Sequence, residues 1–128
     1  MSRALDCALA MILLVVTVPT RSRAQPVPLG DELIVNRETF GSQAKPAIAS
    51  DGAGRFVVVW SGAGPIRGQR FDADGAPSGT EIEVAPAGSI ASSPRVAMAG
   101  DGAFLVTWRE STPEIVARAF DESGAPRA

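Results

Sequence analysis

Four side chains carry the chemistry of a ligand site: Trp60, Trp108, Arg67 and Arg70. An indole ring offers an apolar face on which a sugar can stack, and a guanidinium donates paired hydrogen bonds to a carboxylate. Each also has a structural interpretation. Tryptophan buries a large area, so one that recurs in two similar stretches fits a shared core, and arginines often lie on exposed strands without a ligand. We favour the core for both tryptophans and keep a ligand platform as the alternative.

Catalytic chemistry has few candidates. The chain contains no histidine, which excludes Ser-His-Asp and Cys-His arrangements and a histidine-based zinc site. Lys45 could pair with Ser42 as base and nucleophile, but nothing in the sequence activates that pair. We therefore expect a protein that is not an enzyme and that uses no cofactor.

The aspartate-rich turns are the remaining candidates. Residues 72–75 (Asp-Ala-Asp-Gly) resemble the start of a calcium loop, with Glu81 downstream. An EF-hand needs further ligands and a longer loop, and the copy at residues 121–124 (Asp-Glu-Ser-Gly) lacks the second aspartate. A turn in which the aspartate bonds its own backbone explains these residues, and also Asp51 and Asp101. The sequence therefore predicts no metal site.

Two stretches of five residues must position these side chains, residues 56–60 (Phe-Val-Val-Val-Trp) and 104–108 (Phe-Leu-Val-Thr-Trp). β-Branched and aromatic residues between turns are typical of short strands. Side chains alternate along a strand, which places Val58 with Trp60 and Val106 with Trp108. Residues 56–60 are apolar on both faces, so we expect an inner strand covered on both sides.

The chain also repeats itself. The period of roughly 49 residues is typical of propeller blades and other stacked β-modules. It divides the chain into a first repeat at about residues 30–78 and a second at about 79–128. The matching blocks are residues 30–35 with 79–84, 46–49 with 94–97, Trp60 with Trp108, and 71–77 with 120–126.

Each repeat is predicted to form four antiparallel strands. The first covers residues 33–36, copied at 82–84, where Glu81 and Glu83 suit an exposed edge. The second starts at Pro46 or Pro94, because proline at a strand's first residue loses no ladder bond. The third strand holds the tryptophan, at residues 56–60 or 104–108, and we name it the Trp strand. The last strand covers residues 66–71 or 115–120. We predict an all-β fold of two tandem four-stranded, propeller-blade-like repeats, with an eight-stranded β-sandwich as the alternative.

The beginning of the chain, residues 1–24, is typical of a secretory signal peptide. An arginine precedes an apolar run from Cys7 to Pro19, and Ser22 and Ala24 supply the small residues of a cleavage site. Cleavage after Ala24 would leave a chain that begins at Gln25, contains no cysteine and carries nine basic against thirteen acidic residues. That mild acidity argues against nucleic acid or an anionic membrane as partner. We expect a secreted, periplasmic or cell-surface protein.

Four motifs resemble tandem repeats of about fifty residues found in large exported bacterial proteins. They are Val-Asn at 35–36, Gln-x-x-Pro at 43–46, Asp-Gly…Val-Val-Val-Trp at 51–60 and Gly-Gln-Arg-Phe-Asp-x-x-Gly at 68–75. The second copy departs from this pattern at Ala85 and at residues 117–120. The resemblance implies blade-like modules of surface or adhesin-like proteins and no particular activity.

These observations predict a structural or interaction module that binds an unknown protein or glycan partner. A carbohydrate-binding, lectin-like oligomer is the alternative. Two blades cannot close a ring, because propellers use typically 4–8, and the outer faces of the modules would expose apolar side chains. We therefore expect either a homo-oligomer, which as a trimer would have six blades, or a marginally stable protein.

Overall fold

The computed structural model describes residues 30–128, so the predicted signal peptide lies outside the described residues. The chain divides into two units, Met1–Asp31 and Glu32–Ala128. Of the first unit only Gly30 and Asp31 are described, as irregular backbone. All that follows concerns the second unit.

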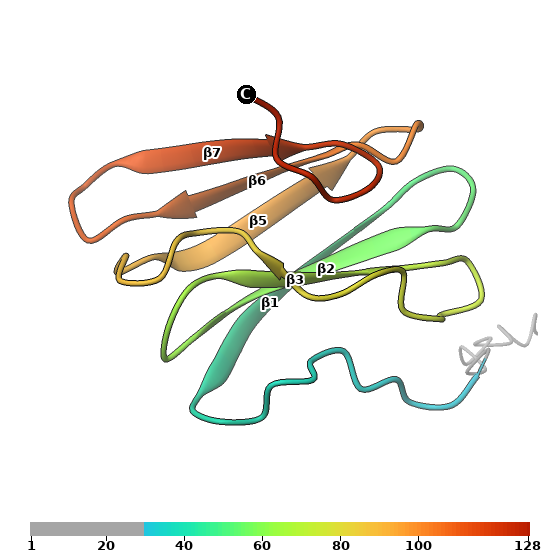
Figure 1. Cartoon of the computed structure of the whole chain (residues 1–128), viewed down its shortest axis with the longest axis horizontal. Helices are drawn as coiled ribbons and strands as arrows, with labels where there is room; N and C mark the ends of the chain where they lie inside the picture. Colours follow the sequence, from blue (N-terminus) through green and yellow to red (C-terminus); the bar gives the residue numbers. More distant parts are fainter. Residues whose placement is uncertain (1–29) are drawn as a thin grey trace, which may run out of the picture. The chain divides into compact units, whose positions relative to one another are not determined.

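The second unit is all-β, with seven strands in two antiparallel sheets and no helix among its described residues (Figure 1). The first sheet has the order β1-β2-β3-β4 and the second the order β5-β6-β7. Both are simple meanders of consecutive strands. The strands are β1 (Gln43–Ser50), β2 (Phe56–Gly62), β3 (Arg67–Phe71), β4 (Ile82–Glu83), β5 (Ser92–Met98), β6 (Phe104–Arg109) and β7 (Ile115–Phe120).

The two Trp strands, β2 and β6, lie inside their sheets, as the sequence predicts. In the first sheet, Val58 lies between Ile48 and Gln69 on the neighbouring strands. In the second sheet, the residues 48 or 49 positions later take the equivalent places. Phe56 stacks on Phe71 with ring centroids 4.8 Å apart, and Phe104 stacks on Phe120 at 4.9 Å. Equivalent residues of the two repeats are therefore paired in the same register in the two sheets.

Each sheet has two chemically different faces. We name the side that carries the tryptophan the Trp face and the opposite side the back face. In the first sheet Val57 and Val59 lie on the back face, and in the second sheet Leu105 and Thr107 do. Strand alternation assigns each side chain to one of these two faces.

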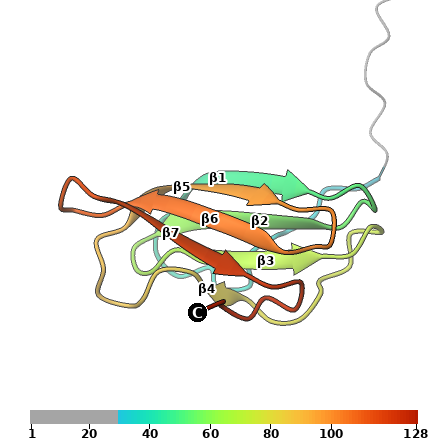
Figure 2. The same ribbon diagram turned by 90° about the horizontal axis from the view of Figure 1, so that it is seen from above.

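The sheets stack with the Trp face of the second on the back face of the first. Val57 and Val59 from the first sheet share one buried cluster with Phe104, Val106 and Trp108 from the second. Figure 2, seen from above, shows β5–β7 crossing over β1–β3. Unlike faces meet, so the contact is head to tail.

The Trp face of the first sheet is covered by a stretch of irregular backbone, residues 32–42, which we name the covering segment (Figure 1, cyan). Val35 of this segment packs on the small cluster of Val58, Trp60 and Phe71. Val84, 49 positions later, packs in the same way in the cluster that holds Trp108. The covering segment thus repeats for Trp60 what residues 84–91 do for Trp108.

The predicted first strand at residues 33–36 is wrong, because the chain there is irregular. Its copy does form β4, over Ile82–Glu83, by pairing with β3 of the preceding sheet. A strand needs a partner edge to satisfy its backbone groups. In the described part of the chain no sheet precedes residues 33–36, so they have no such edge.

The predicted starts of the second strands, at Pro46 and Pro94, are also wrong. β1 and β5 begin earlier, and in each the register shifts across the proline and the residue before it. The bulged residues Lys45 and Ser93 have φ of 52° and 57°, in the left-handed region that L residues rarely adopt. A bulge accommodates a missing N–H inside a strand, so proline is tolerated there and not only at a strand's start.

The described residues close into neither a barrel nor a propeller. Within residues 30–128 there is no helix that could cross a membrane. No described element covers the back face of the second sheet, and on the outer edge of β7 only the end at Ala119 and Phe120 is bridged, by residues 126–127.

Candidate functional site

The two tryptophans are buried. Trp60 is 5% exposed and Trp108 is 3% exposed. Trp108 lies between the sheets and its indole N–H donates to Glu110 Oε1 at 2.8 Å. A stacking platform needs an open ring face, and in this conformation neither indole offers one, so the geometry favours their core role.

Arg67 and Arg70 point to opposite faces of the first sheet, because they are three residues apart on one strand. Arg67 lies opposite Trp60 and pairs with Glu81, Nη1 to Oε2 at 3.4 Å. Arg70 lies opposite Val57 and donates from Nη1 to the carbonyl oxygen of Glu122 at 2.7 Å. The structure therefore does not bring the two guanidinium groups together, and Arg70 instead ties β3 to a turn of the second sheet.

The bulge residues of the two sheets meet each other. Lys45 Nζ donates to Ser93 Oγ at 3.2 Å, so the partner of Lys45 is Ser93 and not Ser42. Lys45 is exposed and Ser93 half-buried. A serine–lysine pair gains reactivity from a desolvated lysine, and this surface contact does not provide one. The pair instead joins the two bulges of β1 and β5.

The aspartate turns are closed by their own backbone groups. Asp51 Oδ1 accepts from the N–H groups of Ala53 and Arg55, and Oδ2 accepts from Arg55 Nε at 2.6 Å. Burial raises the pKa of Asp51, but the Arg55 side chain and then the two backbone N–H groups outweigh burial and leave that pKa below its ordinary value. Each bond favours the charged form. This carboxylate is therefore a structural part of its hairpin.

The turn at Asp121 is built in the same way. Its Oδ1 accepts from the Ser123 hydroxyl at 2.6 Å and from the N–H groups of Ser123 and Ala125. The bond from the Ser123 hydroxyl, followed by that from Ala125, lowers the pKa of Asp121 against the effect of burial. Within residues 30–128, no group of three histidine, cysteine, aspartate or glutamate side chains is placed to hold a metal ion.

A small hollow lies beside Trp60. It has a volume of about 150 Å³ and is lined by the covering segment and β1, including Asn36 and Gln43. Asn36 and Gln43 each donate a side-chain N–H to a carbonyl of the covering segment, at 2.8 and 3.3 Å. Ligand pockets commonly have volumes of about 300–1,000 Å³, so this hollow would hold only part of a small molecule.

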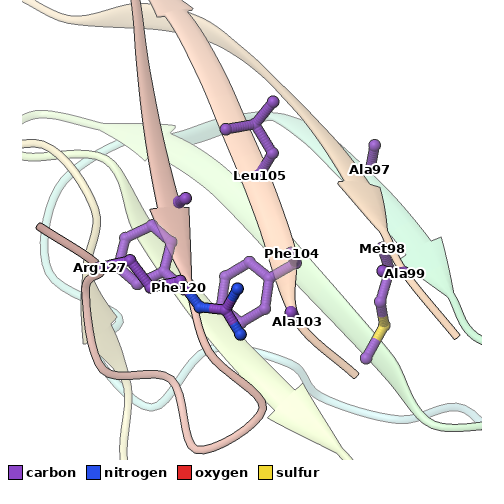
Figure 3. Close-up of a pocket in the computed structure, with 9 residues that line it drawn as sticks. Ala97, Met98, Ala99, Ala103, Phe104, Leu105, Phe120 and Arg127 are labelled. Atoms are coloured by element: carbon purple, nitrogen blue, oxygen red, sulfur yellow. The ribbon is translucent and has the colours of Figure 1, made fainter. Parts of the chain in front are cut away.

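A larger hollow of about 360 Å³ lies at one end of the second sheet. Figure 3 shows Leu105 and Ala97 projecting from neighbouring strands, with the rings of Phe104 and Phe120 further along. The lining is mostly apolar, and Arg127 is the only charged residue among the described residues that line it. The chemistry suits an apolar partner surface.

The back face of the second sheet continues from this hollow. Leu105 is 44% exposed and Ile115 is 73% exposed, and the alanines opposite Leu105 on both neighbouring strands, Ala97 and Ala119, lie on the same face. β7 is also an edge strand, since β6 is the only strand that pairs with it in the described unit and residues 126–127 bridge only its end, at Ala119 and Phe120. The same face also carries Arg95, Thr107 and Arg109. Exposed apolar side chains beside an open strand edge are typical of surfaces that bind other polypeptides.

Leu105, Ile115 and the edge of β7 are not among the predicted site residues. Strand alternation from Trp108 does place Leu105 on the opposite face, and among the described residues a second sheet covers that face only in the first sheet. This reasoning would have found the surface.

The chain matches no protein-family model, no curated protein and no solved structure.

Proposed function

We propose that the chain is an exported β-repeat protein that acts as a structural or interaction module. The finer fold in this proposal is two consecutive propeller-like blades. Two features support that assignment: the shared register of the two meanders, and their head-to-tail stacking of Trp face on back face. Blades of a propeller are four-stranded sheets arranged radially in this way.

One observation carries the interaction role: Leu105 and Ile115 are exposed apolar side chains on the uncovered back face of the second sheet, which also carries Arg95 and Arg109 and borders the open edge of β7. Its counterpart in the first sheet, around Val57 and Val59, is fully buried under a neighbouring sheet. Exposed apolar side chains at positions whose counterparts are buried fit a surface that gains its cover from a partner.

Site-specific photo-crosslinking tests this role. A photoreactive amino acid replaces Leu105 in the full-length chain, and a matched variant carries it at Ser111, which is exposed in the turn after β6. We expect protein adducts from position 105 and only background from position 111 when the exported protein is irradiated where it accumulates. Equal adduct yields at both positions would remove the support for a binding role of this face.

A glycan-binding oligomer is the second candidate, and the hollow beside Trp60 favours it. An indole edge together with the amides of Asn36 and Gln43 is a combination that recognises sugar hydroxyl groups. Titration of the intrinsic tryptophan fluorescence with a panel of sugars tests this candidate. A sugar-dependent change should disappear in Gln43→Ala, and a chain that shows no change with any sugar of the panel does not bind glycans through Trp60.

A further inference from the structure

We infer that a second copy of this chain covers the back face of the second sheet, with its own Trp face and covering segment. The contact would repeat between copies the head-to-tail contact that joins the two sheets within one copy. The inference rests on the proposed interaction role and adds the identity of the partner. Three comparisons of residues 48 or 49 positions apart carry it.

The first comparison concerns the two outer faces. Pro94 is fully buried and Val96 half-buried where the second sheet packs on the first, whereas their counterparts Pro46 and Ile48 are exposed, Ile48 to 65%. On the other side of the stack, Val57 is fully buried and its counterpart Leu105 is exposed. Each copy therefore presents counterparts of both halves of the internal contact, one at each end of the stack, although Arg95, Thr107 and Arg109 stand on the outer back face where the first sheet has Ala47, Val59 and Ser61.

The second comparison concerns the hollows. A hollow of about 150 Å³ lies by Phe56 and Phe71 of the first sheet, and the turns of the second sheet enter it with Gly102 and Glu122. The equivalent hollow, by Phe104 and Phe120, is the one of about 360 Å³. It is larger where no turn enters it. The equivalent turns in a second copy carry Gly54 and Ala73, which are small enough to enter.

The third comparison concerns the open edge. β4 pairs with β3 through Gly68 opposite Ile82 and Arg67 opposite Glu83. The counterparts are Ala117 and Val116 on β7, whose outer edge has no strand in the described unit, and Leu33 and Ile34 on the covering segment, which are exposed. In this register residues 33–34 of one copy add a fourth strand to the second sheet of the next. The missing first strand would thus form between copies.

The contact between copies would have fewer polar interactions than the contact between the two sheets within one copy. Arg70 donates to the Glu122 carbonyl and Arg55 lies over Gly102, but the counterparts of these arginines are Ala119 and Ala103. We therefore expect association that depends on protein concentration. A head-to-tail contact closes into a ring or continues as a filament. Two to four copies would supply roughly four to eight sheets, the usual range of closed propellers, and three would supply six.

Light scattering on the purified protein, over a range of concentrations, tests the partner. We expect a mass that is a small multiple of the protomer. Leu105→Asp places a charge in the contact and should weaken association by about 100-fold or more. Ile90→Asp is the matched control: Ile90 stays 73% exposed although its own sheet already has the internal contact, so this change should leave the mass unaltered.

A disulfide trap tests the register. In a chain with Cys7→Ser, the pair Leu33→Cys and Ala117→Cys would face each other between copies, directly opposite on adjacent strands. Within one copy both sheets separate the two positions. Oxidation should link copies covalently, whereas Leu33→Cys with Ser111→Cys should give only background.

The outcomes separate the two proposals. A protein that stays monomeric at all concentrations, an assembly that survives Leu105→Asp, or a trap that does not link copies overturns the second-copy inference. A monomer that still gives position-specific adducts at position 105 with another protein overturns only this inference and leaves the interaction role standing.

Discussion

Replacing Val106 by alanine should be more destabilising than the same change at Val58, although the two residues hold equivalent places in their sheets. Val106 is fully buried in the cluster that spans both sheets. Val58 belongs to the smaller cluster under the covering segment, which is irregular backbone. The difference therefore measures how firmly each Trp face is covered.

The magnitudes follow from burial and from the freedom to relax. Valine to alanine removes two methyl groups, worth about 1.6 kcal/mol at roughly 0.8 kcal/mol each. A cavity term adds to this where the surroundings cannot collapse. Two packed sheets hold their positions around Val106, so we expect a loss of about 2–3 kcal/mol there. An irregular segment can follow the shortened side chain at Val58, so we expect a loss of roughly 1 to roughly 2 kcal/mol at that position.

Denaturant-induced unfolding of the three single variants Val106→Ala, Val58→Ala and Leu105→Ala provides the assay. Leu105 is the matched control because it is the next residue on β6 and is 44% exposed; its truncation should change the free energy of unfolding by less than about 1 kcal/mol in the monomer. If Val106→Ala behaves like Leu105→Ala, or costs less than Val58→Ala, the assignment of the main core is refuted. Measurements at low protein concentration keep association between copies out of the comparison.

Two further predictions concern the turns and the bulges. The lowered pKa values of Asp51 and Asp121 mean that their contribution to stability is fully present above the ordinary value of 3.8 and is lost as the pH falls through the folded-state values. Asp121→Asn should therefore lower stability at pH 7 and flatten the acid branch of a pH titration of stability; an unchanged acid branch would contradict the hydrogen bonds assigned to Asp121. At the bulge, Lys45→Val should destabilise the fold by about 1–3 kcal/mol relative to Lys45→Gly, because a β-branched residue does not tolerate a φ of 52°, and equal thermal unfolding of the two variants would show that the bulge is absent in solution.

The inner strands and their faces could be predicted from the sequence because the signal is local. Runs such as residues 56–60 are made of residues that fit a pleated, buried surface, and alternation then fixes which side chains share a face. The same rule separates Arg67 from Arg70, since an odd number of steps along a strand changes face. Grouping these two arginines as one platform ignored that rule. The turns were equally local, because aspartate and glycine close them through their own backbone bonds.

The first strand and the bulges could not be predicted in the same way. Whether residues 33–36 form a strand depends on a partner edge elsewhere, and their composition contains no information about it. The bulges depend on Lys45 and Ser93, two residues without any special preference for a positive φ. The only local hint is the proline one position later, which is compatible with a strand start as well as with a bulge.

The exposed surfaces follow from the order of the chain. Each repeat begins with a segment that covers the Trp face of its own sheet. The same segment can pair with the last strand of the preceding sheet, so each repeat makes its contacts with the repeat before it. The first sheet therefore has its Trp face partly covered by Val35, while no described element covers the back face of the second sheet. An open edge next to an apolar face also favours uncontrolled strand pairing. A second copy in the same head-to-tail arrangement covers the face, pairs the edge and fixes the register at once, whereas a two-fold contact between like faces would cover the back face and leave residues 33–34 without a partner strand.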